Sequence, residues 1–216
     1  MNYSSTTTLR AEQLECIRND ILLFNKLDFR LQAGEILQVT GINGSGKTSL
    51  LRILCGLILP EQGVVYWNDV DIRKENSEYL QQISYVGHQN GIKSELTPLE
   101  NLRVATVLKG GDGGLSTAEV IRYFGLAELQ DISVQKLSSG QRRRVALSRL
   151  LLSRARLWIL DEPFTSLDRD TRKLVNHMIE AHSNEGGMVI LTSHEPLEIK
   201  TSKLIRINLE RPVQRA

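Results

Sequence analysis

The chain reads Gly41-Ile42-Asn43-Gly44-Ser45-Gly46-Lys47-Thr48-Ser49 at the point that decides its fold. The first eight of these residues fit G-x-x-x-x-G-K-[ST], the pattern of a loop that cradles phosphate groups. An apolar strand is expected before the loop, over residues 35–40, and leucine and isoleucine recur at helical spacing over residues 48–57. This strand–loop–helix order is the context that the pattern requires, and it predicts an α/β fold with a mostly parallel sheet.

The residue types in this loop suit the binding of a nucleotide triphosphate. Glycine allows the backbone to wrap closely around phosphates with its N–H groups pointing inward, and the start of the helix adds a positive dipole. Lys47 is expected to neutralise charge on the β- and γ-phosphates, and the Thr48 hydroxyl to ligate Mg²⁺. A glycine-rich turn before an ordinary helix is the alternative, which the flanking strand and helix disfavour.

A second apolar segment ends in two acids. Leu157-Trp158-Ile159-Leu160 is continuously hydrophobic, as in a strand buried on both faces of a parallel sheet, and Asp161-Glu162 follows. Ligands collect at the carboxyl ends of such strands. We therefore expect Asp161 to hold the Mg²⁺ shell and Glu162 to polarise the water that attacks the γ-phosphate. The alternative is that both acids merely cap the next helix, which the phosphate loop upstream makes the weaker interpretation.

A third segment, Leu137-Ser138-Ser139-Gly140-Gln141, separates this chain from most phosphate-loop ATPases. Alone it could simply be a serine-capped helix start. Together with the two other segments, in this order and over nearly the whole chain, it resembles the nucleotide-binding subunits of ABC transporters. The resemblance implies a single nucleotide-binding domain over residues 1–216. Its ATPase core would span about 1–95 and 136–216 and include a small antiparallel β subdomain, and a helical subdomain would span about 96–135.

The same resemblance implies how the site is completed. In this family the segment at 137–141 closes over the γ-phosphate of ATP bound to the opposite subunit, so a homodimer with two ATP molecules between its subunits is implied. Asp168 matches the family's aspartate that crosses the dimer interface. His194 matches the histidine that contacts the γ-phosphate, although a histidine at a strand end can also be purely structural.

Two positions depart from the family pattern. His88 stands where most ABC subunits have a glutamine that touches Mg²⁺, and an imidazole, unlike an amide, titrates near neutral pH. Arg18 lies where an aromatic residue usually stacks on adenine. A planar guanidinium can also stack on a purine, but Arg18 could equally be a solvated charge on a strand.

The segment from Tyr85 to Leu102, with His88-Gln89-Asn90-Gly91 inside it, is similar to the ATP-binding subunits of the cytochrome c biogenesis haem exporters. That resemblance implies integral membrane permease subunits as partners, a peripheral position on the cytoplasmic side of the bacterial inner membrane, and ATP hydrolysis that serves haem transport or the release of a haem-loaded chaperone. The alternatives are a soluble ABC-type ATPase acting on nucleic acid or ribosomes, and the ATP-binding subunit of a different small-substrate transporter.

Composition narrows these alternatives. The chain has 27 basic and 25 acidic residues, which gives no reason to expect a nucleic acid partner. The run Arg142-Arg143-Arg144 is expected to face acidic neighbours or the ATP interface. There is no stretch of 18 apolar residues and no apolar secretion signal at the start, which predicts a chain that stays in the cytoplasm. Cys16 and Cys55 lack metal-site spacing and are expected to be reduced core residues.

Overall fold

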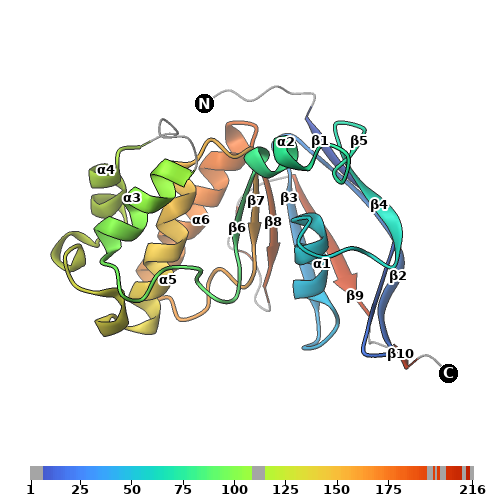
Figure 1. Cartoon of the computed structure of the whole chain (residues 1–216), viewed down its shortest axis with the longest axis horizontal. Helices are drawn as coiled ribbons and strands as arrows, with labels where there is room; N and C mark the ends of the chain where they lie inside the picture. Colours follow the sequence, from blue (N-terminus) through green and yellow to red (C-terminus); the bar gives the residue numbers. More distant parts are fainter. Residues whose placement is uncertain are drawn as a thin grey trace.

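The computed structural model describes residues 7–108, 115–193, 197, 199, 203–210 and 213–214. Two sheets organise this part of the chain (Figure 1). One is antiparallel, has the strand order β10-β2-β1-β4-β5, and is called sheet A here. The other has the order β6-β7-β8-β3-β9, pairs its strands in parallel, and is called sheet B. The predicted fold class, a mostly parallel core with a small antiparallel subdomain, is confirmed.

Sheet A is built on two long strands, β1 and β2, and contains three shorter ones. Its strands are β1 Thr8–Arg18, β2 Ile21–Gln32, β4 Gln62–Trp67, β5 Val70–Asp71 and β10 Val213–Gln214. In β1, Leu9 and Ala11 are buried and alternate with polar residues, as expected of a sheet with one solvated face. These polar positions hide the strand from a search for apolar runs.

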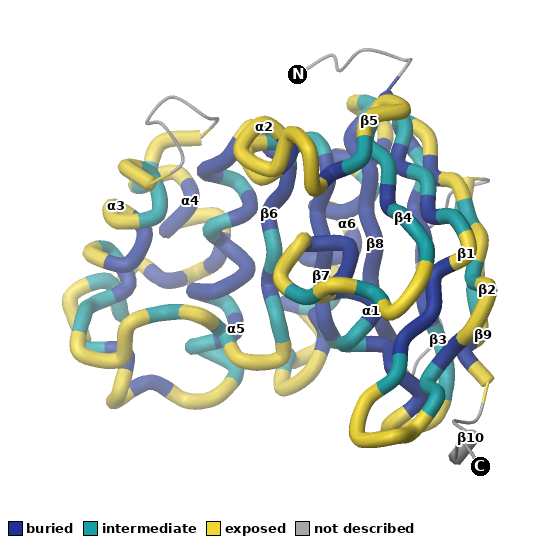
Figure 2. Tube along the Cα trace, turned by 45° about the vertical axis from the view of Figure 1, so that its right-hand side comes forward, coloured by how far each residue is buried: buried dark blue, intermediate teal, exposed yellow. Residues whose placement is uncertain are grey.

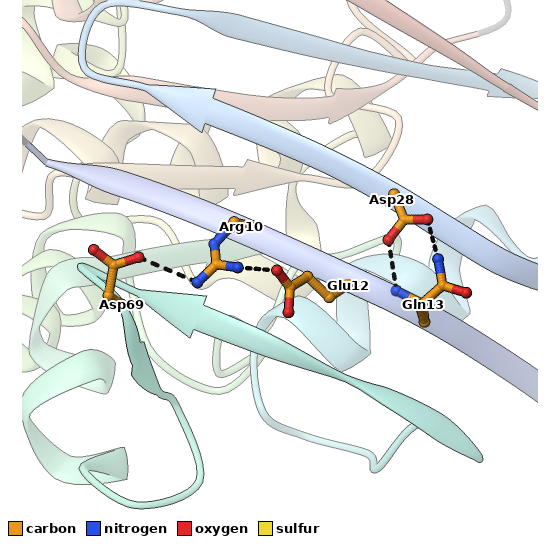
Figure 3. Close-up of polar contacts among 5 residues, drawn as sticks. All are labelled: Arg10, Glu12, Gln13, Asp28 and Asp69. Atoms are coloured by element: carbon orange, nitrogen blue, oxygen red, sulfur yellow. Dashed lines mark hydrogen bonds and ion pairs between the residues drawn. The ribbon is translucent and has the colours of Figure 1, made fainter.

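A bulge in β1 explains why its pattern is hard to follow. The pairing of β1 with β2 shifts between Ala11 and Leu14, and Gln13 has a φ of 50°. The extra residue returns Leu14 to the buried face, which a regular strand would have turned outward. Asp28 on β2 supports the bulge: its carboxylate accepts the Gln13 backbone N–H at 2.8 Å and the Gln13 side-chain amide as well (Figure 3).

Sheet B contains β3 Ile36–Gly41, β6 Ile83–Val86, β7 Leu157–Leu160, β8 Met188–Thr192 and β9 Leu204–Leu209. Its central strands separate two cores. In β7, Leu157 and Ile159 belong to the core shared with sheet A, whereas Trp158 and Leu160 belong to the core beneath the helices. Figure 2 shows the buried positions concentrated along these strands and the exposed positions along the loops at the rim. The inner strands of the sheet are therefore shielded from solvent, whereas the edge strand β9 exposes Arg206 and Asn208.

The helices divide between the two faces of sheet B. One group, α1 and α2, packs on the side of sheet A, and α3 to α6 cover the other face (Figure 1). Their bounds are α1 Lys47–Leu54, α2 Asn76–Gln82, α3 Pro98–Leu108, α4 Thr117–Tyr123, α5 Ser139–Ser148 and α6 Arg169–Asn184, with 3₁₀ turns η1 Ala127–Leu129, η2 Val134–Lys136 and η3 Arg149–Leu152. The glycine cluster at 110–114, expected to be a connector, lies outside the described residues.

Both cysteines are buried and free, as expected. Burial in the core beside α1, together with the charge of Asp161, raises the pKa of the Cys55 thiol to about 12. The thiol therefore stays protonated at neutral pH, which makes it a poor nucleophile and a poor metal ligand.

A stacked ring pair makes the stability of the fold depend on pH. The rings of Trp158 and His182 lie 3.8 Å apart between centroids and are tilted by only 4°. Burial lowers the pKa of His182 to about 4, below the 6.5 of an exposed histidine. The unfolded chain therefore binds a proton more readily, so this contribution to stability is complete above pH 6.5 and is lost as the pH falls towards 4.

We expect the free energy of unfolding to fall by about 2 kcal/mol between pH 7 and pH 5 because of this one group. Urea denaturation of the wild type and of His182→Gln at both pH values measures the contribution. The variant should lose this part of the pH dependence whatever its absolute stability. Equal pH dependence in the two proteins would show that His182 does not carry it.

Candidate nucleotide site

The phosphate loop connects β3 to α1, as the sequence predicts. Gly46 precedes α1 with a φ of 97°, a left-handed conformation that favours glycine, and a Cβ there would lie 2.9 Å from the Cβ of Leu23. The buried ammonium of Lys47 donates to the carbonyl oxygens of Gly41 at 2.8 Å and Ile42 at 3.0 Å. The lysine is thus held across the loop, with its charge where the phosphates of a nucleotide would lie.

A cavity of about 410 Å³ opens beside this loop. It joins the loop to the carboxyl ends of β6 and β7, and its lining includes His88 and both predicted acids. The lining residues are Leu23, Asn43, Gly44, Gly46, Lys47, Thr48, Ser49, His88, Asp161, Glu162 and Thr165. Residues far apart in the sequence therefore meet at one concave site, which is the usual form of a small-ligand site.

Asp161 stands at the centre of a hydrogen-bond network in this cavity. It is 2% exposed, and its Oδ2 accepts the Thr48 hydroxyl at 2.8 Å. Its Oδ1 accepts the hydroxyl of Thr192, at the end of β8, also at 2.8 Å. The Thr192 oxygen in turn accepts the backbone N–H of Glu162 at 2.8 Å. The network links the loop, the acid pair and the neighbouring strand into one rigid unit.

Thr192 was missed as a site residue by the sequence argument. Its signal is a polar residue at the carboxyl end of a predicted buried strand, the same signal that singled out Asp161. Nothing in the sequence says that β8 lies beside β7, and without that neighbour relation the hydroxyl has no assigned partner.

Glu162 adopts an uncommon backbone conformation. Its φ of 49° lies in the left-handed region, which few residues other than glycine, asparagine and aspartate enter. Such strain persists only where the surroundings impose it, and it is concentrated at functional sites. The turn after β7 is therefore held by its neighbours rather than by local preference.

Arg143, in the arginine run, faces the acid pair, in keeping with the expectation of acidic neighbours. Arg143 is buried, and its guanidinium donates to backbone carbonyls of the acid pair, Asp161 at 2.7 Å and Glu162 at 2.8 Å. Burial lowers the pKa of Arg143, while the charges of these two acids raise it. Charge patterning alone cannot reveal which acids these are, because α5 packs on the helical face of sheet B and brings Arg143 to the end of β7 only in the folded chain.

The segment at 137–141 forms the start of α5 but does not line this cavity. Ser138 and Gln141 make a reciprocal capping box, with the Ser138 oxygen accepting the Gln141 N–H at 3.2 Å and the Gln141 oxygen accepting the Ser138 N–H at 2.8 Å. A Cβ on Gly140 would lie 2.5 Å from the carbonyl oxygen of Ser166. Leu137 is buried and Ser139 is exposed.

Asp168 lies just beyond Ser166 and caps α6, accepting the N–H of Thr171 at 2.7 Å. The structure thus brings the segment at 137–141 next to the loop that holds Asp168. Neither the segment at 137–141 nor Asp168 lines the cavity at the phosphate loop of the same chain, although Thr165 in the loop before Asp168 does.

The other predicted residues, except those already described, do not line the cavity or lie outside the described residues. Arg18 is exposed at the end of the β1–β2 hairpin and donates to the carbonyl of Ile17 at 3.2 Å; Leu23 on β2, rather than Arg18, lines the cavity. Ile42 and Ser45 belong to the loop but do not line the cavity. Ile42 is half exposed and Ser45 is fully buried. His194 lies outside the described residues.

The donor set suits Mg²⁺. Thr48 and Asp161 place a hydroxyl and a carboxylate oxygen 2.8 Å apart, and hard oxygen ligands that leave positions for water and phosphate are what this ion prefers. Within the described ranges no three histidine, cysteine, aspartate or glutamate side chains converge as a metal cage. The residues therefore fit an ion held jointly with a nucleotide rather than by protein alone.

Comparison with known proteins places this geometry in a family. A family model described as "ABC transporter" matches residues 24–165. The protein named "Cytochrome c biogenesis ATP-binding export protein CcmA" from Nitrosomonas europaea is 48% identical over 194 residues, which cover 89% of this chain and 91% of that one. Its namesake from Escherichia coli K12 is 46% identical over 201 residues, covering 93% and 96% of the two chains.

A solved structure shares the fold. An ATP-binding cassette determined as a dimer in a post-hydrolysis state, bound to ADP and Pi, superposes with a TM-score of 0.77 at 22% identity and covers 95% of this chain and 98% of its own. Among the helices that the structure describes here, none combines the length and the apolar character needed to cross a bilayer.

Proposed function

The chain belongs to the ABC transporter family as an ATPase subunit, and we propose that it powers a membrane complex of the haem-exporter type in cytochrome c biogenesis. The observation that carries this proposal is the network from Thr48 through Asp161 and Thr192 to the Glu162 backbone, at the mouth of a phosphate loop. It assembles the parts that phosphoryl transfer needs: a cradle, a site for a metal and a carboxylate beside it.

The residues take the following roles in hydrolysis. The loop N–H groups and Lys47 hold the β- and γ-phosphates, and Glu162 accepts a proton from the attacking water. Thr48 and Asp161 would hold Mg²⁺, which would neutralise charge on the phosphates. His88 lines the same cavity and can donate to the γ-phosphate, or donate to or accept from the water. His194 is assigned to the γ-phosphate by its match to the family pattern alone.

The second half of each site comes from another copy of the chain. The start of α5 offers backbone N–H groups and the Ser138 hydroxyl, which together suit an anion. Because this helix start lies outside the chain's own cavity and beside the loop before Asp168, it is free to cover the nucleotide of a partner. Two copies then enclose two ATP molecules, and loss of the γ-phosphate lets them separate.

The membrane partners are integral permease subunits, and the chain sits peripherally on the cytoplasmic face of the bacterial inner membrane. Support comes from the names of relatives at 44–48% identity, which describe ATP-binding export proteins of cytochrome c biogenesis. The helical part at about 96–135 is the natural subdomain to transmit closure to the permease. The work done is haem transport or the release of a haem-loaded chaperone.

Affinity purification from membranes tests this proposal. The tagged chain should be recovered from detergent-solubilised inner membranes together with a multi-span protein. When that protein is deleted, the chain should no longer be found in the membrane fraction. Recovery free of membranes, with ATPase activity stimulated by nucleic acid or ribosomes, would instead favour a soluble ABC-type ATPase. A permease whose deletion leaves c-type cytochromes intact would indicate a different transported substrate.

A further inference from the structure

One side chain on α5 ties together two segments that line the nucleotide cavity. Arg143 is 4% exposed and directs its guanidinium at the carboxyl ends of β6 and β7. Every acceptor is a polar oxygen of these two segments, and all but one is a backbone carbonyl. The contacts are Asp161 O at 2.7 Å, Glu162 O at 2.8 Å, Pro163 O at 3.4 Å, Gly87 O at 2.8 Å and Asn90 Oδ1 at 3.1 Å.

A second arginine completes the grip on the segment after β6. Arg149, at the start of η3, donates to the carbonyls of Asn90 and Gly91, both at 2.7 Å. Burial lowers the pKa of Arg149, as it does that of Arg143. The acceptors of the two guanidiniums therefore lie on either side of His88 in the sequence, at Gly87 and at Asn90–Gly91. His88 itself lines the nucleotide cavity. We call Arg143 and Arg149 the arginine clamp.

The physical chemistry of this clamp is specific to arginine. A buried charge is unfavourable unless its donors are satisfied, and the five acceptors around Arg143 provide for that. A planar fork can reach two chain segments at once in a fixed geometry, whereas a lysine ammonium is a single point on a flexible stem. An apolar side chain would be enough to fill this space. The number of directed hydrogen bonds therefore indicates that Arg143 fixes the relative positions of the two segments.

We propose that Arg143 is a positioning residue that fixes the Glu162 turn and the His88 segment relative to each other for hydrolysis. The inference rests on the proposed function of the same site. Glu162 needs such support because its φ of 49° is not a conformation that the residue prefers. Since Arg143 also lies two residues beyond the 137–141 segment, the helix start that would meet a partner's ATP is built on the same helix as the clamp.

The test compares Arg143→Gln and Arg143→Lys with the wild type in the full chain, co-expressed and purified with its membrane subunits. We expect turnover at saturating ATP to fall on the order of 100-fold, as for a misplaced reacting group, with the dissociation constant for ATP changing by less than about threefold. Arg149→Gln removes only the outer half of the clamp and should lose turnover to a smaller extent. Arg154→Gln, the same change at an exposed arginine beyond η3, should behave as wild type.

Amide hydrogen exchange separates this inference from the proposed function. In Arg143→Gln, residues 87–91 and the amides of Asp161 and Glu162 should exchange faster while the rest of sheet B is unchanged. If exchange changes in this way but the wild-type complex does not hydrolyse ATP, the clamp is supported and the proposed function is refuted. Unchanged exchange in these segments, or parallel losses of ATP affinity and thermal stability that match the loss of turnover, would overturn the clamp.

Discussion

Glu162→Gln should abolish ATP turnover while ATP binding persists. The carboxylate lines the cavity beside the phosphate loop, and the amide that replaces it cannot accept a proton from the attacking water. General-base catalysis contributes about 100- to 10,000-fold, so we expect turnover to fall by this factor. Under the proposed dimer, the variant should also hold ATP in a stable two-chain complex. Single-turnover hydrolysis and light scattering of the ATP-loaded variant measure the two effects.

The control for this variant is Glu61→Gln, the same change at an exposed glutamate in the turn before β4. It should hydrolyse ATP at the wild-type rate. Turnover in Glu162→Gln within about tenfold of the wild type would assign the proton transfer elsewhere. A variant that is inactive but strictly monomeric with ATP, both alone and with its membrane subunits, would support Glu162 as the general base and contradict an ATP site shared between two chains.

Lys47→Ala should weaken ATP binding itself. The ammonium is buried and held by two loop carbonyls, so it is already in place for the phosphates and little ordering is needed on binding. Hydrogen bonds to charged groups contribute about 1.5–3 kcal/mol each, which corresponds to an increase in the dissociation constant on the order of 100-fold when the phosphate contacts are lost. Titration with a fluorescent ATP analogue measures this directly.

Lys74→Ala is the matched control, because Lys74 is exposed on the chain after β5, outside the lining of the nucleotide cavity. A dissociation constant that changes equally in both variants would mean that general charge, rather than contact with the phosphates, governs binding. The thermal unfolding curve of the nucleotide-free protein shows whether Lys47→Ala disrupts helix α1. A lowered thermal stability would indicate such damage rather than the loss of phosphate contacts alone.

Local signals account for much of what the sequence predicted. The strand before the loop, the helix after it and the buried strand ending in Asp161 each combine a period of hydrophobicity with a stop signal, and each lies within a few residues of its expected place. The capping role of Ser138 is also local, since it involves residues three positions apart. The subdomain limits at 95 and 136 remain predictions.

Long-range contacts account for what could not be predicted. Thr192 joins the site only because β8 lies beside β7, and Arg143 only because α5 packs where its side chain reaches the end of that strand. Neither relation has a signature in one sequence. Arg18 stays a prediction: counting residues from the loop lysine places it near adenine, and in the structure Leu23 on the twelve-residue strand β2 lines the cavity whereas Arg18 does not.

The alternation of side chains along β7 has a consequence for how this enzyme can vary. Its four residues belong in turn to the core against sheet A and the core beneath the helices, and the strand ends in both acids. Side-chain volume can therefore be exchanged within one core without repacking the other. A change that slides the strand along its axis, however, displaces both carboxylates together. Heat-sensitive alleles of such a protein should cluster around this strand and lose turnover before they lose the fold.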